Sequence, residues 1–187
     1  MRHVSILKLT ISGLLIAVGI IIPMFSPIKI ILEPASFTLA SHVATFIAMF
    51  ISPGVAGAVA IGTACGFFLG GFPIVIVFRA ASHIVFALAG AFLLQKLPDI
   101  ISSAVKLRLF SFLIALIHAC CELIVVSALY FGGSMGESFY QKGFILSVLL
   151  LVGVGTVVHS MVDFEIAQLV LLPLKKASRN GLFSAEK

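Results

Sequence analysis

The sequence predicts an all-α integral membrane protein with six transmembrane helices and both termini in the cytoplasm. Composition is the first reason, because 61% of the 187 residues are hydrophobic and only 10% are charged, against about 45–50% and about 25% in soluble domains. The second reason is that long apolar runs alternate with short loops. The third is that the positive charges lie mainly in those loops and at the chain ends. We therefore expect one six-helix transmembrane domain spanning residues 1–187, surrounded by the lipid bilayer.

Six apolar runs approach the roughly 20 residues that a helix needs to cross a bilayer. They lie at 5–24, 35–52, 53–70, 73–95, 109–131 and 144–172. The first is interpreted as a retained helix and not as a cleaved signal peptide, because no small-residue cleavage site follows it. Pro and Gly punctuate the ends of the second and third runs. The last run is long for one crossing, so we expect it to tilt or to extend into the cytoplasm.

The positive charges predict the orientation of the chain. With the N-terminus inside the cell, only Lys29 and Lys142 fall in outer loops, and nine cations fall in cytoplasmic segments. The nine are Arg2, Lys8, Lys96, Lys106, Arg108, Lys175, Lys176, Arg179 and Lys187. Cytoplasmic loops carry such an excess of Lys and Arg, so we expect a multi-pass protein of the plasma membrane. The same distribution explains the net charge of +5 without nucleic-acid binding, since no basic stripe with interleaved aromatic residues is present.

Ionisable residues inside the apolar runs are the candidate functional residues. They are His42, Arg79, His83, His118, Glu122, His159, Asp163 and Glu165. Such residues rarely face lipid and usually pair with one another or line a polar cavity. Three pairs are spaced i,i+4 on the last three runs, namely Arg79 with His83, His118 with Glu122, and His159 with Asp163. Because residues four apart share a helix face, we expect these three faces to turn toward a common cavity.

Two interpretations of Arg79 remain open. Arg79 lies about 9 Å into its helix from the outer end, at 1.5 Å per residue, and Glu122 lies in the outer half of the fifth run. Arg79, His83 and Glu122 could share a cavity that opens outward, in which the guanidinium binds a ligand carboxylate and a histidine bonds a ring nitrogen or hydroxyl. Alternatively, Arg79 only neutralises Glu122 and the ion pairs lock the helices together.

No metal or cofactor is expected. Histidines and carboxylates at i,i+4 would suit an intramembrane zinc hydrolase, but the His-Glu-x-x-His motif is absent and Arg79 would repel a cation. The absence of a P-loop motif excludes ATP hydrolysis of that kind by this chain. Cys65, Cys120 and Cys121 show no metal or disulfide spacing and are expected to be small buried side chains. A binding subunit, a stand-alone channel or proton-coupled carrier, and a structural assembly subunit remain as classes, and an intramembrane metal hydrolase remains as the least favoured one.

Small residues at spacing four predict close helix contacts. In the third run, Gly54, Ala58, Gly62 and Gly66 form such a face, which we expect to pack within the molecule. In the first run, Gly13 and Ala17 form a second face, which could instead dock another protein.

Layout and local sequence together resemble the S component, the substrate-binding subunit, of an energy-coupling factor (ECF) vitamin transporter. The stretch LEPASFTLASHVATFIAMFISPGVAGAVAIGTACGFFLGG, at 32–71, is similar to the family's loop into helix two, tight turn and Gly/Ala-rich helix three. Ser52-Pro53 stands where the family often has Gly-Pro, and Ala44 where it often has proline. The resemblance implies an outward-facing vitamin pocket built from helices four to six and capped by the loop between helices one and two. It also implies a transmembrane coupling subunit that docks on Gly13 and Ala17, and two cytosolic ATPases.

Three stretches are similar to the niacin-type subfamily of S components, namely ASFTLASH (35–42), FPIVIVFRAASH (72–83) and GTVVHSMVDFEIA (155–167). This similarity implies a ligand such as nicotinate, with its carboxylate on Arg79 and its ring nitrogen near His83, His118 or His159. The expected substrate-binding residues are Arg79, His83, His118, Glu122, His159, Asp163, Ser41, His42 and Phe37. Pantothenate would suit Arg79 equally, whereas pyridoxine and hydroxymethylpyrimidine would offer it no carboxylate.

Overall fold

The structure, a computed structural model, describes residues 2–32 and 35–177, most of which are helical. In chain order the elements are α1 (Arg2–Phe25), β1 (Lys29–Leu32), β2 (Ala35–Thr38), α2 (Val43–Met49), α3 (Pro53–Leu69), α4 (Ile74–Lys96), the 3₁₀ helix η1 (Pro98–Ser102), α5 (Ala104–Phe131), α6 (Glu137–Phe144), the π-helix η2 (Ile145–Val154) and α7 (Gly155–Ala177). Four segments are long and apolar enough to cross a membrane, namely Ile6–Phe25, Ile74–Lys96, Ala104–Phe131 and Glu137–Lys176, and α3 is a shorter apolar helix. The expected helical membrane protein is thereby confirmed.

The second apolar run does not form one helix, and the prediction of a continuous helix over 35–52 is wrong. Its first four residues form β2, which pairs antiparallel with β1 in the register Lys29 with Thr38 and Leu32 with Ala35. A turn follows in which Ala40 has a φ of 67°, a left-handed conformation that ends a regular helix or strand. Only the seven residues of α2 are helical. Apolar runs of this length do not distinguish strand from helix by periodicity.

Helix α2 lies at the centre of the molecule. All seven of its residues are buried, and it contacts α1, α3, α4 and α7. Phe46 packs against Phe86 of α4 and Phe164 of α7, with ring centroids 5.8 and 5.3 Å apart. A helix that is apolar on every side belongs in the interior. This central position holds the residues just before α2 in the middle of the bundle.

Helices α1 and α3 approach closely through glycine. Ile16 and Ile20 of α1 lie over Gly62 and Gly66 of α3, where an added Cβ would come within 2.5 and 2.1 Å of their Cδ1 atoms. The predicted internal packing of the small-residue face is therefore confirmed for these two positions. The rest of that face, at Gly54 and Ala58, is exposed.

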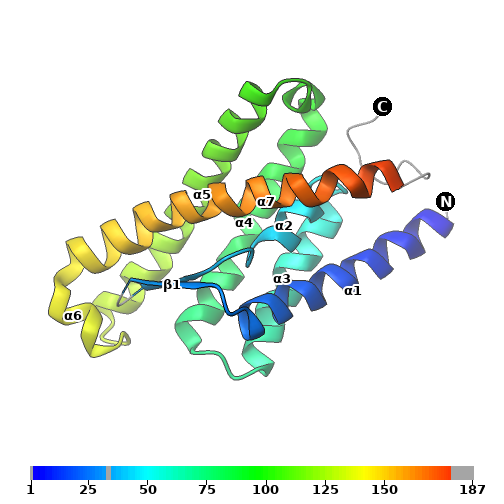
Figure 1. Cartoon of the computed structure of the whole chain (residues 1–187). Coiled ribbons are helices and arrows are strands. Elements are labelled where there is room, and N and C mark those ends of the chain that lie inside the picture. The colour runs from blue at the N-terminus through cyan, green and yellow to red at the C-terminus, as the bar shows by residue number, and fades with distance from the viewer. Residues whose placement is uncertain (1, 33–34, 178–187) are drawn as a thin grey trace.

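The long last run begins beyond a break at Gly143, which has a φ of 74°. From there η2 and α7 continue as one long helical rod that packs across α5 (Figure 1). The last run therefore forms one long segment that lies oblique to α5 (Figure 1).

The cysteines do not occupy the buried positions expected of them. Cys65 of α3 and Cys120 of α5 are exposed, and Cys121 is partly buried. The helix faces that carry Cys65 and Cys120 point away from the core, which neighbouring residues of the same helices fill.

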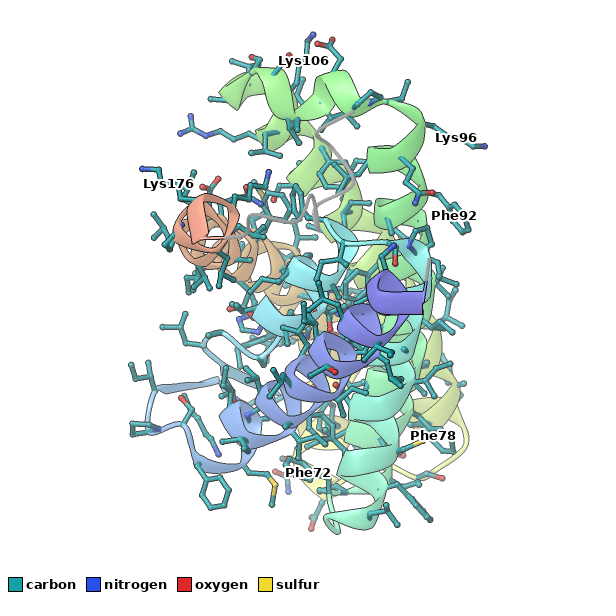
Figure 2. All side chains as sticks on the ribbon, turned by 90° about the vertical axis from the view of Figure 1, so that its right-hand side faces the viewer. Phe72, Phe78, Phe92, Lys96, Lys106 and Lys176 are labelled. Atoms are coloured by element: carbon teal, nitrogen blue, oxygen red, sulfur yellow. The ribbon has the colours of Figure 1, made fainter. Side chains whose placement is uncertain are left out.

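Positive charges gather at one end of the molecule. Lys96, Lys106 and Lys176 lie toward the upper end in Figure 2, and Phe72 lies at the opposite end. Lys106 pairs there with Asp99 of η1, and its ammonium, together with the Ser102 hydroxyl, holds the pKa of the Asp99 carboxyl below its usual value. Among the cations expected at this end, Arg179 and Lys187 lie outside the described residues.

Candidate functional site

Helices α4, α5 and α7 bring their polar faces together, as the i,i+4 spacing predicts. His42, which immediately precedes α2, lies among them. Its ring centroid is 4.8 Å from that of His83 on α4, 4.7 Å from that of His118 on α5 and 5.1 Å from that of His159 on α7. Four imidazoles from four different segments therefore meet at one centre.

The buried carboxylate of Glu122 is the first anchor of this centre. Arg79 donates two hydrogen bonds to it, from Nε to Oε1 at 3.1 Å and from Nη2 to Oε2 at 2.8 Å. The Thr156 hydroxyl donates to Oε2 at 2.6 Å. The Nε2 atoms of His83 and His118 lie 3.4 and 3.5 Å from Oε1. Arg79 thus neutralises Glu122, one of the two arrangements expected for it.

The buried carboxylate of Asp163 is the second anchor, and it holds the turn between β2 and α2. Oδ1 accepts from the backbone N–H of Ala40 at 2.7 Å, and Oδ2 accepts from the backbone N–H of His42 at 2.9 Å. The same Oδ2 lies 3.0 Å from His42 Nδ1 and 3.4 Å from the hydroxyl of Ser41. Asp163 therefore stabilises the left-handed Ala40 and fixes the position of His42.

A cavity of about 170 Å³ borders these anchors. Phe72 belongs to its wall, and Phe72 lies at the end of the molecule opposite Lys96 and Lys106 (Figure 2). Seven of the nine predicted binding residues line the cavity, namely Phe37, Ser41, His42, Arg79, His83, Glu122 and His159. The other two, His118 and Asp163, support it from behind through Glu122 and His42.

Sequence reasoning missed several residues of the site. Lys29 of β1, Thr45 and Thr63 line the cavity, and Thr156 and Ser160 of α7 bond to Glu122 and His118. The sequence does contain a pattern that predicts Thr156 and Ser160. These two residues and Asp163 are spaced four and three apart, so they share one helix face. No local signal could place Lys29, whose strand reaches the cavity only through the hairpin.

The predicted docking residues Gly13 and Ala17 are both exposed on α1. An added Cβ at Gly13 would meet no atom within 4 Å. Leu9 and Leu14 beside them are exposed as well. These small residues therefore serve no packing role within the described part of the chain.

Replacing Asp163 by Asn is expected to destabilise the protein by about 1–3 kcal/mol, the usual cost of leaving buried hydrogen-bonding groups unsatisfied. An amide group offers one acceptor oxygen where the carboxylate offers two, so a backbone N–H of Ala40 or His42 loses its partner. Thermal unfolding of the purified protein in detergent measures the change.

Glu165→Gln is the matched control for Asp163→Asn, because it makes the same chemical change on the same helix. Glu165 is exposed and lies 4.0 Å from the exposed Arg108, so a shift within about 0.5 kcal/mol is expected. Equal melting temperatures for both variants would contradict the anchoring role of Asp163.

Comparison with known proteins identifies a relative of known activity. No family model matches the chain, and no solved structure matches it. The niacin transporter NiaX of Lactococcus lactis subsp. cremoris (strain MG1363) is 39% identical over 187 residues, which cover 100% of this chain and 82% of NiaX. Identity at this level over the whole chain confirms the resemblance seen in the sequence, and the chain therefore belongs to the NiaX family of niacin-type S components.

Proposed function

We propose that the chain is the membrane-embedded substrate-binding subunit of an ECF-type importer and that it captures nicotinate from outside the cell. Membership in a transporter family assigns it to transport and not to enzymatic catalysis, so the intramembrane hydrolase is no longer a candidate. The relative is named as a niacin transporter. On this chain itself, the cavity is the single observation that supports nicotinate as the ligand.

The size of the cavity suits a small ligand. Its volume of about 170 Å³ lies below the roughly 300–1,000 Å³ typical of sites for drug-sized molecules. A molecule that consists of a single aromatic ring and one carboxylate, such as nicotinate, has a size that matches this volume. Pantothenate, an extended molecule, is less well matched, and pyridoxine and hydroxymethylpyrimidine lack the carboxylate that the cations around the cavity would bind.

The chemistry of the wall also suits nicotinate. Phe37 and Phe72 provide aromatic surfaces, against which a pyridine ring can stack. Imidazoles of His83 and His159 can hydrogen-bond a ring nitrogen. Arg79 and Lys29 are the cations of the described wall, and a carboxylate would be held between them. Since Arg79 already pairs with Glu122, we expect the exposed Lys29 to supply the added positive charge.

A charge-neutral double substitution tests the role of Arg79 in binding. Arg79→Gln combined with Glu122→Gln removes both charges and leaves no buried carboxylate unpaired. Nicotinate affinity, measured by calorimetry on detergent-purified protein, is expected to fall about 10-fold to 100-fold, since a hydrogen bond to a charged group contributes about 1.5–3 kcal/mol.

The matched control is Arg108→Gln with Glu165→Gln, which neutralises an exposed pair that is not part of the cavity wall and should keep the affinity of the parent. Retained affinity in the Arg79 and Glu122 variant would remove this pair from the site. Nicotinamide is the control ligand, and equal affinity for it would show that no carboxylate is recognised.

We further propose six membrane segments with both termini in the cytoplasm of a plasma-membrane protein, in which α2 and the hairpin together serve as the second segment. The gathering of Lys96, Lys106 and Lys176 at one end supports this orientation (Figure 2). The cavity then opens to the outside, because its wall includes Phe72 at the other end.

Cysteine labelling tests this orientation. In a background with Cys65, Cys120 and Cys121 replaced by alanine, Ser134→Cys lies in an outer turn and Ser102→Cys in an inner one, and both serines are exposed. A membrane-impermeant maleimide added to intact cells should label the first and spare the second until the cells are permeabilised. The reverse pattern would invert the proposed topology.

The exposed face at Gly13 and Ala17 is proposed to dock on the transmembrane coupling subunit, which works with two ATPase subunits. Small residues allow two helices to approach closely in a bilayer. Ala17→Leu should therefore reduce ATP-driven uptake strongly while leaving nicotinate binding intact, since Ala17 is exposed and is not one of the residues that line the cavity.

Reconstitution of the chain in liposomes, with and without the coupling and ATPase subunits, measures this effect. Ala128→Leu is the matched control, an exposed alanine on α5 whose replacement should leave uptake unchanged. Transport by this chain alone would favour a stand-alone carrier and contradict the proposed assembly.

A further inference from the structure

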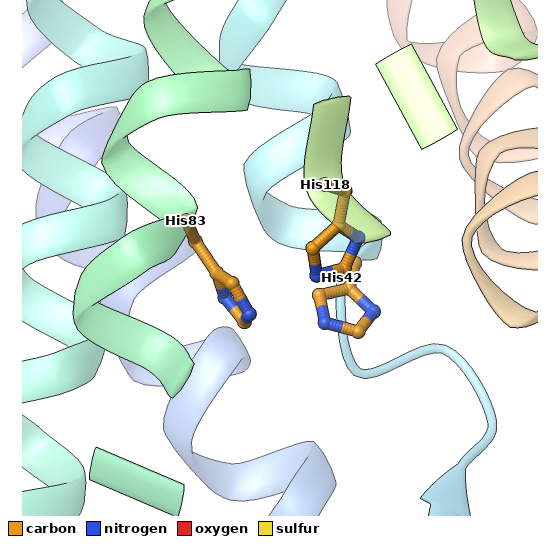
Figure 3. Close-up of side chains that lie close together, drawn as sticks. All are labelled: His42, His83 and His118. Carbon is orange, nitrogen blue, oxygen red and sulfur yellow. The ribbon is translucent and has the colours of Figure 1, made fainter. Parts of the chain in front are cut away.

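Three histidines, of which His42 and His83 line the cavity, form a compact cluster in the interior of the molecule. His42, His83 and His118 come from the start of α2, from α4 and from α5, and all are largely buried. One ring nitrogen of each lies within 4.8 Å of the others. Figure 3 shows the ring of His83 extending toward the rings of His42 and His118.

Hydrogen bonds orient two of these rings through one nitrogen each. His42 Nδ1 lies 3.0 Å from the carboxylate of Asp163, and His118 Nδ1 lies 3.2 Å from the hydroxyl of Ser160. Metal-binding histidines commonly have this arrangement, in which one ring N–H bonds a carboxylate or another oxygen and the second nitrogen keeps its lone pair for the metal.

The second nitrogen of His118 lacks a hydrogen-bond partner. His118 is fully buried, and its Nε2 atom has no hydrogen bond within the described part of the chain. Its nearest acceptor, Glu122 Oε1, lies 3.5 Å away, at ion-pair distance but outside hydrogen-bond geometry. Buried polar atoms are nearly always paired, so an unpaired nitrogen beside two further imidazoles indicates a ligand.

Fixed charges around the cluster favour a cation. Arg79 carries one positive charge, and Glu122 and Asp163 carry one negative charge each, so these buried groups sum to −1 when the histidines are neutral. The guanidinium, which could repel a metal ion, is held by Glu122 through two hydrogen bonds. Lys29 also lines the cavity, but it is exposed and does not belong to this buried set.

We propose that His42, His83 and His118 bind a divalent transition-metal ion of the Zn²⁺ class. Imidazole is a preferred ligand of zinc, nickel and copper ions, whereas Mg²⁺ prefers oxygen. Zinc–nitrogen bonds are about 2.0–2.1 Å long, so binding draws the three nitrogens closer together than they lie here. Three protein ligands leave the fourth tetrahedral position free, as in open zinc sites, and this position lies beside the cavity that His42 and His83 line.

Zinc titration of the full-length protein tests the site without reference to any vitamin. The protein is purified in detergent without a histidine tag, with Cys65, Cys120 and Cys121 replaced by alanine to remove competing thiols, and is stripped with EDTA. Calorimetry and elemental analysis should then show one Zn²⁺ per chain, with a rise in melting temperature. Mg²⁺ should produce neither effect.

Two substitutions and one control locate the metal. His83→Ala and His118→Ala should each lower zinc affinity about 10-fold or more. His83 is the less buried of the two, so its variant remains informative if His118→Ala does not fold. His159→Ala should keep the metal, which distinguishes the proposed cluster from the alternative group of His42, His159 and Asp163. Absence of stoichiometric zinc in the parent, or unchanged affinity in His83→Ala, would overturn the proposal.

Discussion

The carboxylate of Glu122 is the interaction on which the polar centre depends. A charge in the interior of a membrane protein must be paired, because neither lipid nor apolar side chains solvate it. Glu122 meets this requirement with Arg79 of α4 and Thr156 of α7, so one side chain of α5 joins three helices. Removing one partner of a buried ion pair typically costs about 3–5 kcal/mol. The relative placement of α4, α5 and α7, and hence the floor of the cavity, is set by this network.

Because of this pairing, Arg79 does not offer an unpaired positive charge to a ligand. Any carboxylate that enters the cavity meets a guanidinium whose charge Glu122 already balances. Further positive charge must come from elsewhere, and Lys29 in the hairpin is placed to provide it. Recognition of an anion would then involve both the membrane core and the loop that covers it.

Asp163 links that loop to α7. Its hydrogen bonds to Ala40 and His42 hold the segment that follows the hairpin, while Phe37 from β2 contributes to the cavity wall. The contact between the Phe37 and His159 rings, with centroids 5.4 Å apart, adds a second link between the hairpin and α7. Displacement of the hairpin would therefore disturb the imidazoles of the site.

Sequence alone determined the membrane class, the long helices and the three i,i+4 polar faces, because composition and helical periodicity act over a few residues. Tertiary structure decided which side chains on those faces pair with one another. The partner of Arg79 is 43 residues away, and the contact between Asp163 and His42 joins positions 121 residues apart. The same long-range contact divides the second apolar run into a strand, a turn and a short buried helix. Local patterns do not encode which distant side chain neutralises a buried charge, since only the packed helices bring the candidates together.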